Sequence, residues 1–211
     1  FRADVVAQVR YRRKPVKIVR GKTWDENPNR TRHLWSPSAM PLREGEGYVS
    51  QKELLFTSYA VGLTDNVAAL VGAFLPGLLF GGDAFNVIGA LKIADEVKEK
   101  LYIGGGAEAM MLPSVGIFGL PFVSLTYGEP DAQLTLNLGK PFALSRDGGD
   151  VGEMLVSVSG MWRFRGDYAI VSENIFIPGI SVDEGWGVLS MNGLAFRSIR
   201  DETAWDLGIV V

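Results

Sequence analysis

Turn signals recur at an almost fixed interval from residue 44 onward, and this spacing constrains the fold more than any other feature. Clusters of Gly, Pro, Asp and Asn follow one another with centres roughly 15–20 residues apart. The segments between them are rich in Val, Ile, Leu, Phe and Tyr and run for about 9–13 residues. Soluble sandwiches use strands of about 5–6 residues, whereas a strand that crosses a hydrocarbon core needs about 9–11. The spacing therefore predicts long strands.

Ten segments fit this description. They are residues 48–62, 67–75, 85–92, 101–111, 116–126, 132–142, 153–163, 168–177, 187–197 and 204–211. Bacterial membrane barrels made from a single chain have an even number of antiparallel strands. The count is consistent with such a barrel.

Several segments alternate between apolar and polar residues. In AQLTLNLGK the three leucines at 134, 136 and 138 oppose Gln, Thr and Asn, and in EMLVSVSGMWRFR Val158 and Trp162 oppose Ser157 and Ser159. In a soluble barrel the apolar face points inward. In a membrane barrel it points to lipid, and the polar face lines the lumen.

Charges collect at the turns rather than within the segments, and aromatic residues gather at the segment ends. These aromatic residues are Tyr48, Phe85, Tyr102, Tyr127, Phe142, Phe164, Tyr168, Trp186, Phe196 and Trp205. Lipid-embedded barrels carry such girdles at both membrane interfaces. We therefore expect an all-β protein, a roughly ten-stranded antiparallel up-and-down transmembrane β-barrel with an N-terminal extension. The alternative is a soluble β-barrel that binds an apolar ligand such as a lipid.

The run VAALVGAFLPGLLFGGDAFNVIGAL, residues 67–91, is long and apolar enough to suggest a membrane helix. Pro76 and the nearby glycines oppose this, because proline costs roughly 3 kcal/mol and each glycine about 1 kcal/mol inside a helix. We expect two neighbouring strands joined by the loop PGLLFGGD. For KIADEVKEKL, residues 92–101, we favour a charged hairpin over a short amphipathic helix.

Charge divides the chain into two regions. Residues 1–43 contain eleven basic and three acidic residues, whereas residues 44–211 contain ten basic and twenty-one acidic residues. We interpret residues 1–43 as a basic N-terminal extension and residues 44–211 as the barrel. The basic arm comprises Arg10, Arg12, Arg13, Lys14, Lys17, Arg20 and Lys22. We expect it to bind anionic lipid headgroups, the acidic surface of another envelope protein or the acidic turns of the barrel itself, and we expect no nucleic-acid partner.

Residues 27–72 resemble a family of uncharacterised, predicted outer-membrane proteins of Gram-negative bacteria. The resemblance depends on Asn27–Pro28–Asn29 with Thr31 and Arg32, on Pro37–Leu42 with Gly45–Tyr48, on Gly62–Asn66 and on the later VSENIF at 171–176. It extends over most of residues 22–211. The resemblance implies a barrel in the outer membrane, with no assigned activity.

Chemistry-bearing residues are few. The chain has no cysteine and one histidine, His33, so thiolate sites are excluded and sites that need several His ligands are disfavoured. Ser36 and Ser38 lie close to His33 in sequence, but such neighbours do not form a triad. The acidic loops DGGD (147–150) and VDEG (182–185) are interpreted as solvated rather than as calcium sites. GGGAE (104–108) lacks the context of a phosphate loop. We expect no enzyme activity, no metal and no cofactor.

Polar residues on the inward face are expected to form a network in the lumen. The candidates are Glu108, Asn137, Glu153, Arg163, Asn174, Asn192 and Asp206. Eight strands enclose only enough space for side chains, so ten strands favour a plugged interior over an open pore. The predicted function is a structural or accessory subunit of an envelope complex, or a minor channel, located in the outer membrane.

Overall fold

The computed structural model describes residues 17–19, 21–24, 26–52, 55–80, 86–113, 115–146, 148–182, 185–200 and 203–211. The first elements are β1 (Lys17–Val19), β2 (Lys22–Trp24), β3 (Gly47–Lys52), β4 (Phe56–Gly62), β5 (Val67–Phe74) and α1 (Leu75–Phe80). They are followed by β6 (Val87–Lys98), β7 (Leu101–Leu112), β8 (Gly116–Glu129), β9 (Ala132–Gly139), β10 (Phe142–Ser145) and β11 (Gly148–Val151). The last elements are β12 (Leu155–Arg165), β13 (Tyr168–Val182), β14 (Gly185–Arg200) and β15 (Thr203–Val210).

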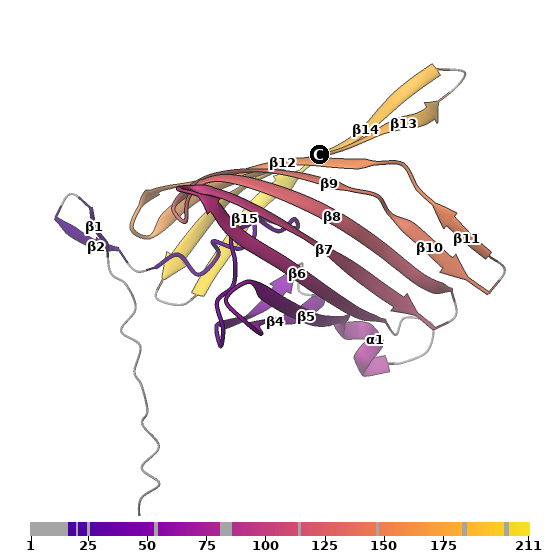
Figure 1. Ribbon diagram of the computed structural model, residues 1–211, viewed down its shortest axis with the longest axis horizontal. Helices are drawn as coiled ribbons and strands as arrows, with labels where there is room; N and C mark the ends of the chain where they lie inside the picture. Colours follow the sequence, from indigo (N-terminus) through magenta and orange to yellow (C-terminus); the bar gives the residue numbers. More distant parts are fainter. Residues whose placement is uncertain are drawn as a thin grey trace, which may run out of the picture.

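The fold is all-β and antiparallel. The strand order of the main sheet is β15-β14-β13-β12-β9-β8-β7-β6-β5-β4-β3, and the hairpin β10–β11 joins it beside β8. Strands β1 and β2 form a separate small hairpin. Figure 1 shows the main sheet curled into a deep trough. The sheet is not closed, since β3 and β15 are its two edges.

The predicted segments match the observed strands with five corrections. The strand β11 (Gly148–Val151) falls in and beside the expected acidic loop DGGD. Residues 48–62 form two strands, β3 and β4, rather than one. Residues 132–142 include all of β9 and the start of β10. Strand β6 continues to Lys98, so the charged stretch from residue 92 is a strand ending in a hairpin, as favoured, but with a shorter turn. Residues 75–80 in the expected loop form the helix α1, whose Pro76 occupies the first turn, where proline is tolerated.

The two rims of the trough differ. One rim has short turns, of four residues at 63–66 and of two residues at 99–100, 130–131 and 166–167. The opposite rim includes the connection through α1 and the hairpins β10–β11 and β13–β14, which extend beyond the neighbouring strands (Figure 1).

The two faces of the sheet differ in polarity. Apolar side chains are exposed and polar side chains are buried, which is the reverse of the arrangement in a soluble protein's sheet. Along β9 the exposed residues are Leu134, Leu136 and Leu138, at 59%, 40% and 38% exposure. The residues between them, Gln133, Thr135 and Asn137, are buried on the concave face. In β12, Ser157 and Ser159 are buried while Trp162 is 61% exposed. The predicted alternation is therefore present, with the polar residues inside.

Aromatic side chains form a cluster on the convex face near the short-turn rim. The ring of Phe164 lies 5.9 Å from that of Trp162 and 6.3 Å from that of Phe196, and Tyr168 lies 5.1 Å from Phe196. Trp205, opposite Ser198 in the neighbouring strand, is 75% exposed. Part of the predicted aromatic girdle is thus gathered at one rim.

The buried apolar core is small. One cluster comprises Met161, Ala169, Val171 and Ile199, and the other comprises Leu42, Ala60 and Ala68. Many of the other buried side chains are polar. Within the described residues, no helix has the length and apolar character needed to cross a membrane.

Candidate functional site: the polar interior

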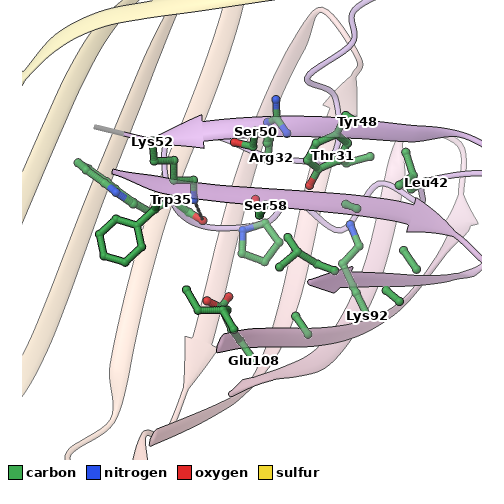
Figure 2. Close-up of a pocket in the computed structure, with 18 of the residues that line it drawn as sticks. Thr31, Arg32, Trp35, Leu42, Tyr48, Ser50, Lys52, Ser58, Lys92 and Glu108 are labelled. Atoms are coloured by element: carbon green, nitrogen blue, oxygen red, sulfur yellow. Dashed lines mark hydrogen bonds between the residues drawn. The ribbon is translucent and has the colours of Figure 1, made fainter. Parts of the chain in front are cut away.

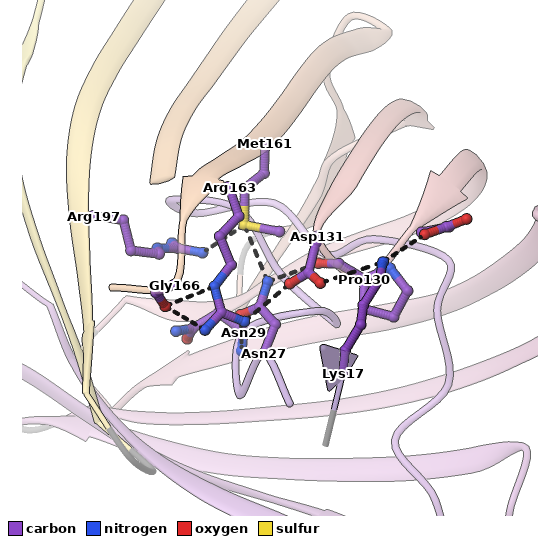
Figure 3. A network of polar contacts seen from close by, with 10 residues as sticks. Lys17, Asn27, Asn29, Pro130, Asp131, Met161, Arg163, Gly166 and Arg197 are labelled. Carbon is purple, nitrogen blue, oxygen red and sulfur yellow. Dashed lines mark hydrogen bonds and ion pairs between the residues drawn. The ribbon is translucent and has the colours of Figure 1, made fainter. Parts of the chain in front are cut away.

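Residues 26–46 form an interior segment, of which residues 26–42 lie inside the trough while residues 43–45 are exposed (Figure 1). The segment enters at the short-turn rim, where Asn27 Nδ2 donates to the carbonyl of Pro130 at 2.7 Å. Asn27 Oδ1 accepts from the backbone N–H of Asn29 at 2.9 Å, the local bond that makes asparagine a favoured turn residue. The Asn-Pro-Asn motif therefore forms a turn that starts the segment along the concave face (Figure 3).

A single buried carboxylate holds the middle of the interior segment. Glu173 of β13 is 1% exposed. Its Oε2 accepts the backbone N–H groups of Leu34 and Trp35, each at 2.9 Å, and its Oε1 accepts that of Ser36 at 2.9 Å. Three consecutive N–H groups converging on one anion form a nest. This arrangement compensates for burying the charge.

Two serines of β12 extend this anchor. Ser36 Oγ lies 3.1 Å from the Oγ atoms of both Ser157 and Ser159. Space for the segment here comes from Gly193 of β14, because a Cβ at that position would lie 3.0 Å from Leu34 Cδ1. At this place the sheet therefore supplies two hydroxyl groups, and the absence of a side chain at Gly193 leaves room for the segment.

A chain of hydrogen bonds links the interior segment to β8 and β9. The backbone N–H of Ala39 donates to Thr126 Oγ1 at 2.8 Å, Thr126 Oγ1 lies 2.8 Å from Thr135 Oγ1, and Thr135 Oγ1 lies 2.9 Å from His33 Nε2. Burial, with a smaller contribution from the charge of Arg197, lowers the pKa of His33 to about 3. His33 is therefore neutral at physiological pH.

Two arginine–aspartate pairs close the short-turn side of the interior. Arg197, 1% exposed, donates to both carboxylate oxygens of Asp206 at 2.6 and 2.7 Å and to the carbonyl of His33 at 2.9 Å. Arg163 donates to Asp131 Oδ1 at 3.0 Å and to the carbonyl of Gly166. Bidentate and charge-assisted bonds of this kind are among the strongest in proteins.

The Arg163 pair also reaches the small hairpin at the chain's beginning. The guanidinium of Arg163 lies over the ring of Trp24, 5.0 Å from its centroid. Lys17 forms ion pairs with Glu129 at 3.1 Å and with Asp131 at 3.9 Å (Figure 3). Among the predicted basic-arm residues, Lys17 therefore binds acidic turns of the sheet. Lys22 lies in β2, and Arg10, Arg12, Arg13, Lys14 and Arg20 lie outside the described residues.

Amide and amine side chains bind the carbonyl groups of the interior segment. Lys92 Nζ donates to the carbonyls of Ser38 and Met40 at 3.0 and 2.9 Å. Gln133 Nε2 donates to the carbonyl of Arg30 at 2.9 Å, and Asn137 Nδ2 donates to that of Pro37 at 3.2 Å. These bonds satisfy backbone groups of a segment that has little regular secondary structure of its own.

The seven predicted lumen residues do not all lie in the interior. Asn137, Arg163 and Asp206 lie on the concave face within the network just described. Glu108 also faces the interior, where it lines a cavity. Glu153 is exposed in the connection before β12.

Asn174 and Asn192 lie on the convex face rather than in the lumen. The preceding residue of β13, Glu173, faces the interior segment, and side chains alternate along a strand. Asn174 pairs with Asn192 across β13 and β14, and their side chains donate to Ser172 and Ser190 on the same face.

The division into an extension and a barrel follows the charge but not the packing. The predicted extension ends at residue 43, yet its residues from Asn27 onward fill the trough and include the buried Ala39, Met40 and Leu42. We find that residues 26–43 and the sheet pack as one structure.

The site contains few groups arranged for chemistry. The Nδ1 atom of His33 has no hydrogen-bond partner among the described residues, whereas a triad histidine needs an acid at that position. Within the described ranges no group of three or more His, Asp or Glu side chains could hold a metal ion. What the arrangement accomplishes is the anchoring of residues 26–46.

Sequence reasoning did not identify Glu173, Arg197, Lys92 or Thr126 as site residues. The alternation of apolar and polar residues in β12 did place Ser157 and Ser159 on the polar face. No comparable signal existed for Glu173, because its partners are backbone N–H groups 137–139 residues away.

The chain was compared with protein-family models, with curated proteins and with solved structures, and none of them matches.

Proposed function

We propose that this chain forms the wall of a β-barrel in the outer membrane of a Gram-negative bacterium. Residues 26–42 occupy much of its interior, and it acts as a structural or accessory subunit of an envelope complex, without catalysis. The occupied interior favours this function over that of an open channel, because the anchored segment occupies the space through which a solute would pass.

The observation that carries the proposal is the inverted burial of the sheet. Leucines and tryptophans of β9, β12 and β15 are exposed on the convex face while serines, threonines and an asparagine of the same sheet are buried. In water this arrangement would leave a large apolar surface exposed, which soluble monomers rarely tolerate. In a membrane the same surface contacts acyl chains, and the polar face lines the lumen.

The longer strands have the length that a bilayer requires. Six strands, β6, β7, β8, β12, β13 and β14, contain 11 to 16 residues each, whereas a tilted membrane strand needs about 9–11.

A bilayer also requires that no strand edge remain unpaired. Strands β3 and β15 run in the same direction, since ten antiparallel steps separate them. Direct closure would therefore be parallel, and one additional strand between them would make closure antiparallel.

The two rims give the proposed orientation. Outer-membrane barrels have short turns on the periplasmic side and longer loops outside. The rim with the short turns, the aromatic cluster and the entry of the interior segment would therefore face the periplasm. Partners of the β1–β2 hairpin would then be periplasmic or envelope proteins.

Fractionation of the expressing cell tests the membrane location. We expect the full chain in the membrane pellet after lysis, resistant to a high-salt or alkaline wash and released by detergent. Recovery in the soluble fraction without detergent would contradict the proposal, and it would favour the soluble barrel that holds an apolar ligand.

A charge on the convex face tests the surface itself. Leu136→Arg should lower the free energy of unfolding in lipid vesicles by about 2–4 kcal/mol, the cost of an arginine at the midplane of a membrane barrel. The matched control is Val97→Arg, beside the turn at Glu99–Lys100, where the cost should be about 0–1 kcal/mol. Urea titration of both variants measures the difference. Equal, small effects within about 0.5 kcal/mol would indicate a water-facing surface.

A further inference from the structure

A cavity of about 300 Å³ lies between the interior segment and the concave face of β3–β8 (Figure 2). This volume is at the small end of the range for small-molecule sites, about 300–1,000 Å³. Phe56, Leu70 and Ile88 contribute apolar lining from β4, β5 and β6. The cavity is therefore large enough for a compact organic molecule, and a large part of its wall is apolar.

Two buried polar atoms at the cavity have no partner. They are Thr31 Oγ1 and Arg32 Nη1, which make no hydrogen bond within the described part of the chain. Thr31 is only 4% exposed, and both residues line the cavity. A buried donor without an acceptor costs about 1–3 kcal/mol, and more when it is charged. Both atoms are closed off from the cavity in this structure, so the acceptor group of a ligand would reach them only by entering the wall beside Thr31 and Arg32.

The guanidinium of Arg32 is already held in place. It lies over the ring of Tyr48, 3.9 Å from the centroid, and its Nε donates to Asn29 Oδ1 at 3.0 Å. An arginine fixed in this way loses little side-chain freedom when a ligand binds, which favours affinity. The remaining Nη1 donor can then bind an anionic oxygen.

The charge of the cavity favours an anion. Arg32 and Lys52 line it, against one carboxylate, Glu108, while the amine of Lys92 is already bound by the carbonyls of Ser38 and Met40. Figure 2 shows Thr31, Arg32 and Tyr48 together beneath β3, with Glu108 on the opposite side of the cavity. A ligand bound in this way would place its negative group near Arg32 and its apolar body toward Leu70 and Ile88.

We propose that this cavity binds a small organic anion, a carboxylate with a compact apolar body, through Arg32 and Thr31. A barrel that serves only as a structural subunit needs no such site, so the inference goes beyond the proposed function. It is also independent of where the chain is located.

The experiment compares three probes of equal chain length on the purified full chain: hexanoate, 1-hexanol and hexylamine. Calorimetric titration should show saturable binding of hexanoate, while the alcohol and the amine bind more weakly. Arg32→Gln should weaken the binding of hexanoate by about tenfold or more, because it removes a charge-assisted hydrogen bond. Arg43→Gln removes an exposed arginine that does not line the cavity, so it is the matched control and should leave the affinity unchanged.

Three results would overturn the inference. They are the absence of saturable hexanoate binding, equal or tighter binding of hexylamine, and unchanged hexanoate affinity in Arg32→Gln. If Arg32→Gln fails to fold, Thr31→Val and Ala90→Leu provide the same test. The first removes a hydroxyl and the second fills the apolar part of the cavity. Both should weaken hexanoate binding, and full affinity in both would also contradict the proposal.

Discussion

The interior segment contacts the two halves of the trough in different ways. Against β9 and β12–β14 it is held by buried polar side chains, of which Glu173 and Arg197 are each 1% exposed. Against β3–β7 it borders the cavity, and Glu108 is exposed to that space. We refer to these as the anchored half and the cavity half.

The difference follows from the sizes of the inward side chains. In the anchored half, long side chains such as Glu173, Arg197 and Gln133 reach backbone groups of the interior segment. In the cavity half, Ala60, Ala68 and Ala90 line the wall with short side chains, although Ala60 and Ala68 pack against Leu42 and Lys92 reaches the carbonyls of Ser38 and Met40. Small residues leave space that long residues would fill. The same segment is therefore fixed on one side and borders a binding-sized space on the other.

Replacing Glu173, which holds the middle of the interior segment, should have the largest effect on the free energy of unfolding. Glu173→Gln replaces an ion that accepts three backbone N–H bonds by an amide with one acceptor oxygen and an NH₂ group that opposes them. Because hydrogen bonds to charged groups contribute about 1.5–3 kcal/mol each, we expect a loss of about 3 kcal/mol in the free energy of unfolding. Urea titration in detergent measures this loss.

Limited trypsin digestion gives a second measure of the same variant. Arg30 and Arg32 lie in the interior segment and should be cleaved faster once Glu173 no longer holds it. The control in the cavity half is Glu108→Gln, which should change stability by no more than about 0.5 kcal/mol. Equal effects of the two substitutions would remove the distinction between the halves.

The alternation of the sequence predicted the faces of several strands correctly. Strand β9 alternates strictly and β12 does so over its middle, so the buried positions of Asn137 and Arg163 followed from the period of two. The pattern failed in β13, where Ser172, Glu173 and Asn174 are consecutive polar residues. Polar side chains then lie on both faces, and hydrophobicity alone cannot indicate which of them points inward.

The anchoring of the interior segment could not be predicted from local sequence. Its bonds to the sheet described above join residues 52 to 164 positions apart, such as Asn27 to Pro130 and His33 to Thr135. The charge of residues 1–43 indicated a separate extension, because composition reports the kinds of residue present and not their packing. The reversal between Lys52 and Phe56 was missed for a similar reason, since no Gly, Pro, Asn or Asp marks it.

A decrease in pH should lower the free energy of unfolding through a group in the anchored half. His33 is buried there, and its pKa is about 3 rather than the ordinary 6.5, mainly because of desolvation and further because of the charge of Arg197. Below pH 6.5 the unfolded chain binds a proton at His33 that the folded chain does not. The free energy of unfolding should therefore fall with decreasing pH, by up to about 1.4 kcal/mol per unit.

The measurement is the unfolding free energy at pH 7.5 and pH 5.5 for the original chain and for His33→Gln. The glutamine does not titrate, so its variant should lose less stability over this interval. Other titrating groups contribute equally to both chains and cancel in the comparison. An identical pH dependence in the two chains would show that His33 is not the group that takes up the proton.

Substitutions that add volume should have the smallest effects on the free energy of unfolding. They should stabilise the cavity half and destabilise the anchored half. Ala90→Leu adds apolar volume to the cavity and should raise the free energy of unfolding by about 0.5–1 kcal/mol, as cavity filling commonly does. Gly193→Ala in the anchored half places a Cβ 3.0 Å from Leu34 Cδ1, and overpacking of this kind costs about 1 kcal/mol or more. Urea titration of the two variants in the same detergent compares them directly. If Ala90→Leu destabilises the protein as much as Gly193→Ala does, the cavity half is as tightly packed as the anchored half, and the contrast between them is wrong.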